Sequence, residues 1–259
     1  MNNKELKDIV ENLIPTFDEA GRESIKIEKE GVKIKTKEDG SPVTNGDLKV
    51  NEIITNKISK LTSSIPIISE ETVDLNKKNT LKTFWLIDPI DGTKEYIAGR
   101  NEYTLNAGLI LDTLPVLGII GVPKKKQIFY SYGKDSSYLL EKNQNKKLNC
   151  KKQSPKGEIH ALTNNKKPPE LILNKLKEFK VTSFRKLSSS YKYCLIATGE
   201  YDLYLDKVRA NEWDDAAGHA IAENAGAIVT SLEKEKFIYG KEDYKNPSLL
   251  MLRSKNLND

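Results

Sequence analysis

Acidic residues follow two short apolar segments of the chain, at positions where a carboxylate needs a partner. Glu70 comes just after the segment 65–68 (IPII), and Asp88 and Asp91 come after the segment 84–87 (FWLI). A carboxylate at the edge of a core costs free energy unless it is hydrogen-bonded or coordinates a cation. Such oxygen ligands suit a hard cation such as Mg²⁺. The sequence therefore predicts a metal site where two buried strands end.

The spacing of the acids indicates how such a site could be built. Asp88 and Asp91 are three residues apart with a proline between them, so both carboxylates and the carbonyl of Ile90 could converge. Glu70 and Asp214 could complete two metal sites that share Asp88, about 3.5–4 Å apart, as in two-metal phosphoryl hydrolysis. Each acid also has an ordinary explanation, as a turn residue, a surface acid or a helix cap. The four together favour a metal centre.

Several elements must position these acids. Segments 5–14 and 44–61 are predicted helices, and in the second Thr44 is a good N-cap with Asp47 in the first turn. Asp47 could simply favour the positive helix N-terminus. The alternating segment 25–36 is typical of a half-buried hairpin. Segment 104–123 is apolar enough for a membrane span, but Asp112-Thr113 at its centre indicates two buried strands and a tight turn.

The second half of the chain alternates strands and helices, which predicts α/β layering. Beyond short strands in 127–140, the Lys/Asn-rich stretch 142–156 is typical of a surface connection. We therefore expect one catalytic unit with an N-terminal α+β half (about 1–150) and a C-terminal α/β half (about 155–259). Its expected elements are strands at 159–163, 181–183 and 202–205, helices at 169–179 and 189–197, and a last helix with Asp214 as N-cap and Gly226 at its end.

Composition excludes several classes of protein. The two cysteines, Cys150 and Cys194, and the two histidines, His160 and His219, are too few for a disulfide framework or a zinc cage. The net charge of +5, from 42 basic and 37 acidic residues, is weak evidence for nucleic-acid binding. The first residues of the chain lack the apolar core of a signal peptide, so we expect a cytoplasmic protein without an integral membrane segment. Peripheral contact with the inner face of the membrane stays open.

Three strings of residues resemble the motifs of a known superfamily. They are Ser69-Glu70-Glu71, the segment 85–93 (WLIDPIDGT) and the segment 213–218 (WDDAAG). They resemble the lithium-sensitive, Mg²⁺-dependent phosphatase superfamily that contains inositol monophosphatase and fructose-1,6-bisphosphatase. Within it, 40–47 (GSPVTNGD), 91–96 (DGTKEY), 189–195 (SSYKYCL) and 213–220 (WDDAAGHA) are most similar to the 3'(2'),5'-bisphosphate nucleotidase family of the CysQ type. The resemblance implies a layered αβαβα sandwich with the active site between the halves.

The resemblance also implies roles for individual residues. Glu70, Asp88 and the carbonyl of Ile90 would hold one metal, and Asp88, Asp91 and Asp214 a second. Asp47 and Thr93 match the pair that orients the attacking water, and Asp47 would lie near a third, weaker Mg²⁺. The expected cofactor is thus two or three Mg²⁺ ions.

Substrate contacts are implied by shorter strings. Ser189 and Lys192 match the family's nucleotide-contacting Ser-x-x-Lys, although a Ser-capped helix with a solvated lysine would look the same. Lys94 and Glu95 stand where inositol phosphatases commonly carry smaller neutral residues. Asp206 stands where bacterial members commonly carry arginine, with Lys207 and Arg209 just beyond. His219 is expected to pack, with a contact to the base left open.

The activity so implied is hydrolysis of 3'-phosphoadenosine 5'-phosphate to AMP and phosphate, which belongs to sulfur metabolism. The alternative is an inositol-phosphate or other sugar-phosphate monophosphatase with the same metals. A nucleic-acid-binding module would need a basic patch without the complete set of acids, so it is disfavoured. We expect a small phosphate monoester as the ligand, no nucleic acid, and a monomer or homodimer.

Overall fold

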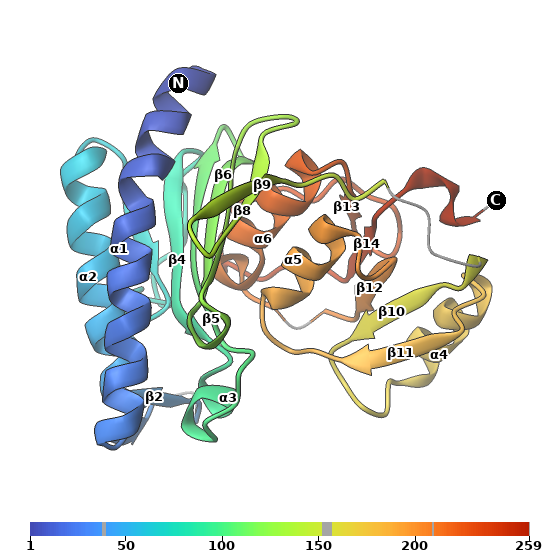
Figure 1. Cartoon of the computed structure of the whole chain (residues 1–259), viewed down its shortest axis with the longest axis horizontal. Coiled ribbons are helices and arrows are strands. Elements are labelled where there is room, and N and C mark those ends of the chain that lie inside the picture. The colour runs from blue at the N-terminus through green and yellow to red at the C-terminus, as the bar shows by residue number, and fades with distance from the viewer. Residues whose placement is uncertain (38–39, 152–156, 209, 259) are drawn as a thin grey trace.

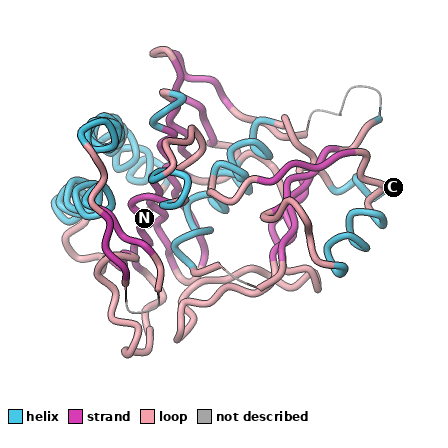
Figure 2. Tube along the Cα trace, turned by 90° about the horizontal axis from the view of Figure 1, so that it is seen from below, coloured by secondary structure: helices cyan, strands magenta, loops and turns pink. Residues whose placement is uncertain are grey.

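The computed structural model of the chain describes residues 1–37, 40–151, 157–208 and 210–258. Helices and sheets alternate in five layers, which Figure 1 shows from left to right and Figure 2 from below. In order, the layers are helices α1 (Asn3–Glu30) and α2 (Asn45–Leu61), a seven-stranded sheet, helices α5 (Tyr191–Thr198) and α6 (Glu212–Asn224), a five-stranded sheet, and helix α4 (Glu170–Glu178). The predicted αβαβα sandwich is confirmed.

Helix α1 is much longer than the predicted helix at 5–14. A capping box between Asn2 and Glu5 starts it, and it continues for 28 residues to Gly31, whose φ of 112° suits glycine. The hairpin predicted at 25–36 is therefore wrong over its first half, because residues 25–30 are helical and only residues 34–36 form a strand. Gly21, Ser24 and Ile27 are buried at a spacing of three, so the segment turns one helical face to the interior, where Gly21 meets Pro123 and the Ser24 hydroxyl meets that of Tyr103.

Helix α2 begins as predicted, with a capping box between Thr44 and Asp47. The strand β2 (Pro42–Thr44) pairs with β1 (Ile34–Thr36) just before it and fixes its start. The buried residues Val50, Ile54 and Ile58 lie on one face of α2. They pack against the seven-stranded sheet, and this packing holds Asp47 at the end of the helix nearest the strand ends described below.

The seven-stranded sheet carries the two acidic strand ends. Its strands in spatial order are β3 (Ile67–Ser69), β4 (Phe84–Asp91), β5 (Thr104–Leu111), β6 (Leu114–Val122), β7 (Gln127–Tyr132), β8 (Ser137–Glu141) and β9 (Gln144–Lys147). Of the strand pairs described in this sheet, only β3 and β4 run parallel. The predicted hairpin at 104–123 is confirmed, because Asp112 and Thr113 take positive φ angles of 47° and 67°, as a two-residue turn requires.

Helix α6 packs directly on the backbone of this sheet through glycines. A Cβ atom added at Gly118 would lie 2.1 Å from the carbonyl oxygen of Ala217, and one added at Gly108 would lie 2.8 Å from the Ala217 nitrogen. Close packing through backbone atoms leaves little freedom to shift. These two glycines therefore set how near the first turn of α6 lies to the ends of β3 and β4.

A methyl group at Gly118 should consequently push α6 away from the sheet. We expect Gly118→Ala to destabilise the protein by about 1–3 kcal/mol, the usual cost of overpacking, and to weaken metal binding. Gly121→Ala on the same strand is the control, because its added Cβ would meet Phe17 at an ordinary 3.5 Å. Thermal melts of both variants check this, and equal melting temperatures would contradict the packing argument.

The five-stranded sheet is formed by the second half of the chain. Its strands in spatial order are β11 (Ser183–Lys186), β10 (His160–Thr163), β12 (Leu203–Asp206), β14 (Leu249–Leu252) and β13 (Ile228–Thr230). The first three are parallel to one another. The strand predicted at 181–183 begins only at Ser183, because Thr182 N and Oγ1 both donate to Ile159 O ahead of the paired segment.

The predicted surface connection at 142–156 holds the edge strand β9, and its residues 152–156 lie outside the described part of the chain. The division into halves at this segment stays a prediction. None of the helices within the described ranges is long and apolar enough to cross a membrane. Short helices complete the fold, namely α3 (Thr93–Ile97), η1 (Pro123–Lys125) and η3 (Lys255–Asn258).

Candidate active site

The parallel pairing of β3 with β4 places Glu70 beside Asp88. Ser69 is in register with Ile87, and the Glu70 amide donates to the Ile87 carbonyl at 3.0 Å. Because both strands run the same way, the residues that follow them leave the sheet at the same edge. The strand predicted at 84–87 continues to Asp91 with an irregularity after Asp88, so both aspartates lie on the strand end rather than in a separate loop.

The third acid, Asp214, comes from the start of α6. The predicted N-cap at Asp214 is wrong, because Asn211 is the cap and Asp214 closes the capping box from the third helical position. The Asn211 amide donates to Asp214 Oδ2 at 2.8 Å, which leaves the other carboxylate oxygen for a different partner. The positive end of the helix also favours negative charge here.

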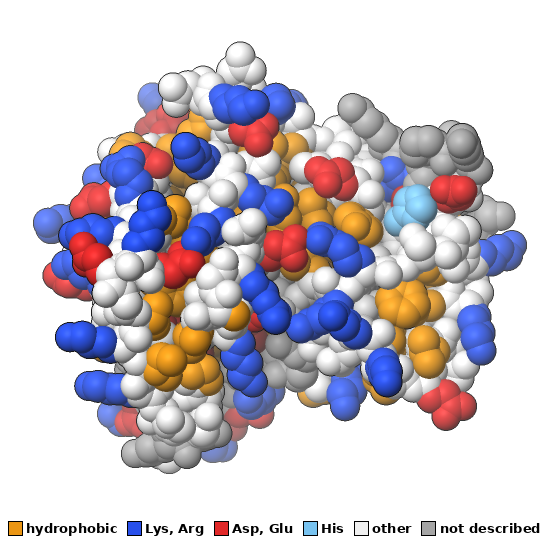
Figure 3. Space-filling model, turned by 60° about the horizontal axis from the view of Figure 1, so that its bottom comes forward, with side chains coloured by type: hydrophobic (Ala, Val, Ile, Leu, Met, Phe, Trp, Pro, Cys, Tyr) orange, Lys and Arg blue, Asp and Glu red, His pale blue; other side chains and the backbone are white. Residues whose placement is uncertain are grey.

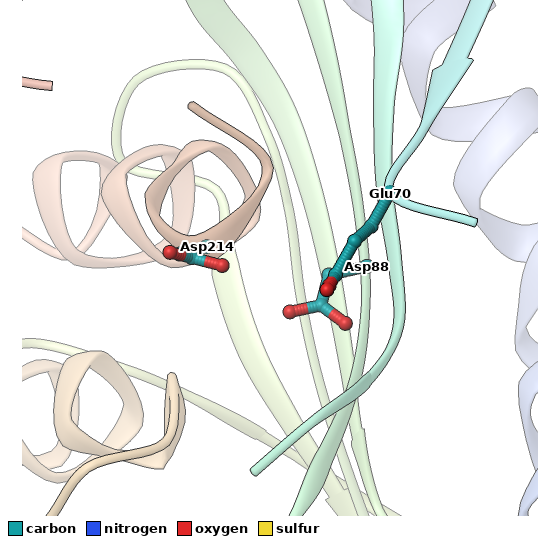
Figure 4. A group of neighbouring side chains, drawn as sticks. All are labelled: Glu70, Asp88 and Asp214. Carbon is teal, nitrogen blue, oxygen red and sulfur yellow. The ribbon is translucent and has the colours of Figure 1, made fainter. Parts of the chain in front are cut away.

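Glu70, Asp88 and Asp214 form an acidic cluster between the two sheets. One carboxylate oxygen from each lies within 4.8 Å of the others, and Figure 4 shows Asp214 on its helix facing Glu70 and Asp88 on the strand ends. Asp88 is buried, and its Oδ1 has no hydrogen-bond partner among the residues that the structure describes. Burial and then the neighbouring Glu70 and Asp91 raise the Asp88 pKa well above its ordinary value, and burial raises the Asp214 pKa to about 8.

These features fit a bound divalent cation. A buried, unpartnered carboxylate oxygen among like charges is costly without a positive partner. Three convergent carboxylates are the hard oxygen donors that Mg²⁺ prefers. Of the residues predicted as metal ligands, the structure therefore brings Glu70, Asp88 and Asp214 within reach of one ion.

Asp91 lies beside this cluster and is held by Ser190, which the sequence analysis did not single out. The Ser190 backbone amide donates to Asp91 Oδ2, and Ser190 Oγ lies 2.6 Å from the same oxygen. Ser190 Oγ also lies 2.5 Å from the carbonyl oxygen of Asp214. Ser190 thus links the end of β4 to the start of α6, and only its place next to Ser189 in a run of serines hinted at this.

Thr93 and Asp47, predicted to act on the water, are neighbours. Thr93 Oγ1 lies 3.5 Å from Asp47 Oδ1 and 3.2 Å from the carbonyl oxygen of Ile90, so its single proton has two acceptors. Asp47 Oδ2 accepts from the amide and the hydroxyl of Thr44, at 2.8 and 2.5 Å. Burial raises the Asp47 pKa, and the hydrogen bonds from Thr44 oppose that shift.

A lysine outside the predicted set reaches the cluster. Lys37 Nζ lies 3.0 Å from Glu70 Oε1 and 3.0 Å from Glu71 Oε1. The Glu71 side chain is only 4% exposed, so Glu71 is not a surface acid. Burial raises the Glu71 pKa to about 7, and Lys37 counters that shift. No sequence motif marked Lys37, because its role depends on where the β1–β2 hairpin lies.

A cleft of about 320 Å³ opens beside the acids. Its walls carry Lys94 and Glu95, both predicted as substrate contacts, together with the acids Glu70 and Asp91. The described residues that line it are Ser41, Pro42, Glu70, Asp91, Gly92, Thr93, Lys94, Glu95, Asn164, Asn165, Lys186 and Ser188. A larger apolar cavity of about 610 Å³ lies between α1 and β6 to β8, away from the acids.

The other predicted substrate contacts, Ser189 and Lys192, are both buried. Ser189 is buried and its hydroxyl donates to the carbonyl of Glu102. The Lys192 side chain is buried, with Nζ 5.3 Å from the ring centres of Tyr193 and Tyr204 and 3.3 Å from the Ser188 carbonyl. Neither residue is among those that line the cleft, and their roles stay predictions.

Two further predicted positions have partners of their own. Asp206 is buried and accepts from the Tyr204 hydroxyl at 3.1 Å and from the Lys207 amide at 2.9 Å, while Arg209 lies outside the described residues. His219 is buried against Phe237 and Tyr239, as expected of a packing residue.

The family of the chain is shown by its sequence, and the five-layer fold with an acidic cluster between its sheets agrees with that result. A sequence model described as the inositol monophosphatase family matches residues 4–257, and the chain belongs to that family. The family predicted from the motifs is therefore confirmed.

Relatives within the family share most of the chain's length. The chain is 29% identical over 247 residues to the 3'(2'),5'-bisphosphate nucleotidase CysQ of Aggregatibacter actinomycetemcomitans, covering 94% of this chain and 92% of the relative. It is 33% identical over 213 residues to the CysQ of Salmonella typhimurium, covering 82% and 85%. The crystal structure of CysQ from Bacteroides thetaiotaomicron matches with a TM-score of 0.75 and 26% identity, covering 96% of this chain and 98% of that one.

Proposed function

We propose that this chain is a metal-dependent 3'(2'),5'-bisphosphate nucleotidase that converts 3'-phosphoadenosine 5'-phosphate to AMP and phosphate. The observation that carries the proposal is the cluster of Glu70, Asp88 and Asp214, in which Asp88 is buried and its Oδ1 has no hydrogen-bond partner among the described residues. The similarity to CysQ nucleotidases over most of the chain supports this choice of substrate. Hydrolysis of an inositol or sugar phosphate is the alternative that a substrate test must separate.

The acids would hold Mg²⁺ in this proposal. Glu70, Asp88 and Asp214 supply carboxylate oxygens, and Asp91 and the carbonyl of Ile90 lie on the same strand end. When bound, the cations would lower the pKa of a coordinated water and neutralise charge on the phosphate and the leaving oxygen. Two or three ions is the number that the sequence resemblance implies.

Thr93 and Asp47 would accept the proton of the attacking water. When Thr93 Oγ1 donates to Asp47 Oδ1, its lone pairs can accept a hydrogen bond from a water in the cleft. Asp47 is anchored by Thr44 and is therefore held in place as the final acceptor. Ser190 would keep the Asp91 carboxylate in a fixed orientation while the substrate binds.

Loss of the Thr93 hydroxyl should therefore slow turnover. We expect Thr93→Ala to lower kcat by roughly 10²-fold, the lower end for a proton-transfer group, while Thr93→Ser keeps most of the activity. Asp47→Asn should lower kcat similarly with little change in melting temperature, since an amide oxygen can still accept from Thr44. Steady-state kinetics and thermal melts check both. An Asp47→Asn variant with normal kcat and a lower melting temperature would mean that Asp47 only caps α2.

The products test the proposed activity directly. With Mg²⁺, adenosine 3',5'-bisphosphate should give AMP and inorganic phosphate, separable by anion-exchange chromatography, and EDTA should stop the reaction. Adenosine 3'-phosphate as the product would mean that the wrong ester is cleaved. Phosphate release that survives thorough chelation would contradict the metal centre.

The remaining partner and location statements stay predictions from the sequence. They are a monomer or homodimer, a cytoplasmic location, and no nucleic-acid ligand. A small phosphate monoester fits the size of the cleft, which is about 320 Å³ and at the lower end for small-molecule sites.

A further inference from the structure

The cleft beside the acidic cluster has two chemically different walls. One wall carries Glu70, Asp91 and Thr93, and the other carries Asn164, Asn165 and Lys186. A phosphate that reacts must lie against the acids and their cations, so the rest of a substrate has to extend toward the second wall. Lys94 and Lys186 are the two cations that line the cleft in the described part of the chain.

Lys186 stands at the place where an α/β sheet usually binds its ligand. It is the last residue of β11 and pairs with Thr163, the last residue of the parallel strand β10. Ligands of open α/β sheets bind outside the carboxyl ends of such strands. The Leu187 amide donates to the Thr163 carbonyl at 2.8 Å, and the Thr163 hydroxyl donates to the Asn165 carbonyl at 2.9 Å. These bonds fix the backbone around Lys186.

The Lys186 side chain is also oriented by an ion pair. Its Nζ lies 3.6 Å from Glu95 Oε1, and the side chain is 34% exposed. Glu95 Oε1 in turn accepts from the Ser188 hydroxyl at 3.2 Å and lies 3.7 Å from Arg100. Because Glu95 has these other partners, the lysine can turn toward an anion without leaving the carboxylate unpaired. Lys94, in contrast, is exposed on α3.

We propose that Lys186 binds the phosphate of the nucleotide that is not hydrolysed, with Glu95 as its positioning residue. This inference rests on the proposed function, since only a bisphosphate has a second phosphate to bind. A cation that is already oriented loses less conformational entropy on binding than a free surface lysine. Lysine and arginine side chains gather over the middle of the face drawn in Figure 3, which would further attract a highly charged anion.

Measuring how tightly the product AMP binds tests the contact with the second phosphate separately from the hydrolysis step. AMP keeps the phosphate that is not hydrolysed, whereas adenosine lacks it. Calorimetry with Mg²⁺ present should show that Lys186→Met weakens AMP binding by roughly 5- to 20-fold, as expected for a charge-assisted contact with partial solvent screening. Adenosine binding should not change, and Lys186→Arg should retain most of the AMP affinity.

A kinetic comparison gives the second measurement. Lys186→Met should raise KM for adenosine 3',5'-bisphosphate by a similar factor and leave kcat nearly unchanged. Hydrolysis of a small monoester such as glycerol 2-phosphate should be unaffected. Lys147→Met, which removes the same charge from the exposed edge strand β9, is the control for net charge and should behave as wild type.

The outcomes separate the two proposals. If the wild type hydrolyses the bisphosphate and Lys186→Met binds AMP as tightly as wild type, Lys186 does not bind this phosphate and the proposed function stands. Equal losses of affinity for AMP and for adenosine in Lys186→Met would also overturn the inference, because they would indicate that Lys186 has a structural role. If the wild type releases no phosphate from the bisphosphate, the proposed function is wrong and this inference falls with it.

Discussion

Asp88→Asn should lower kcat/KM by roughly 10²–10³-fold or more, the size of effect seen when one charge-stabilising group is removed from an active site. The same substitution should raise the melting temperature of the metal-free protein. Asp88 is buried among Glu70, Asp91 and Asp214, which repel its charge, and within the described part of the chain its Oδ1 has no hydrogen-bond partner. A neutral amide of the same shape removes the repulsion and can donate to the neighbouring carboxylates.

This combination of lost activity and gained stability identifies a metal ligand. Substitution of a residue needed for folding would lower both activity and stability, and substitution of a surface acid would change neither. Asp8→Asn, the same chemical change at an exposed position of α1, is the control and should leave kcat/KM and the melting temperature unaltered. An Asp88→Asn variant that is less stable without metal than the wild type would contradict the explanation.

The stability of the wild type without metal should fall as pH rises from about 4 to about 8. The pKa of Asp214 is raised to about 8 and that of Glu71 to about 7 by burial, and the Asp88 pKa is raised well above its ordinary value. In the unfolded chain these groups titrate near pH 4. The folded state therefore binds more protons than the unfolded state across this window, so raising the pH destabilises it.

Mg²⁺ should cancel this loss by pairing with the carboxylates. The difference in melting temperature between samples with Mg²⁺ and with EDTA should be small near pH 5 and largest at pH 8 and above. Thermal melts at constant ionic strength across this range give the result. A difference that does not change with pH, or one that is largest at pH 5, would mean that the acids do not share their site with a cation.

The acidic strand ends could be predicted because their chemistry is local. Glu70 and Asp88 come at the ends of apolar runs, Asp91 follows Asp88 by three residues, and Thr44 and Asp47 form a capping box that three residues of spacing reveal. Motif resemblance then supplied the family and the layered fold. Both the local chemistry and the motif resemblance can be read from short segments of sequence.

The predictions that were wrong concern features that depend on packing between distant segments of the chain. The alternation at 25–36 suits a hairpin as well as a helix, and only the burial of Ser24 and Ile27 in the folded chain selects the longer α1. Asp214 has the chemistry of an N-cap, but Asn211 takes that position. Lys37, Lys186 and Ser190 have no motif of their own, and only the fold brings them to Glu70, Glu95 and Asp91, respectively.

The ratio of kcat/KM values for adenosine 3',5'-bisphosphate and inositol 1-phosphate, measured side by side at the same Mg²⁺ concentration, tests the central claim most directly. A bisphosphate nucleotidase should favour the nucleotide by roughly 10-fold or more, since it alone offers a second phosphate worth about one charge-assisted contact. A ratio that favours inositol 1-phosphate would contradict the proposed function and leave only the metal-dependent phosphatase chemistry.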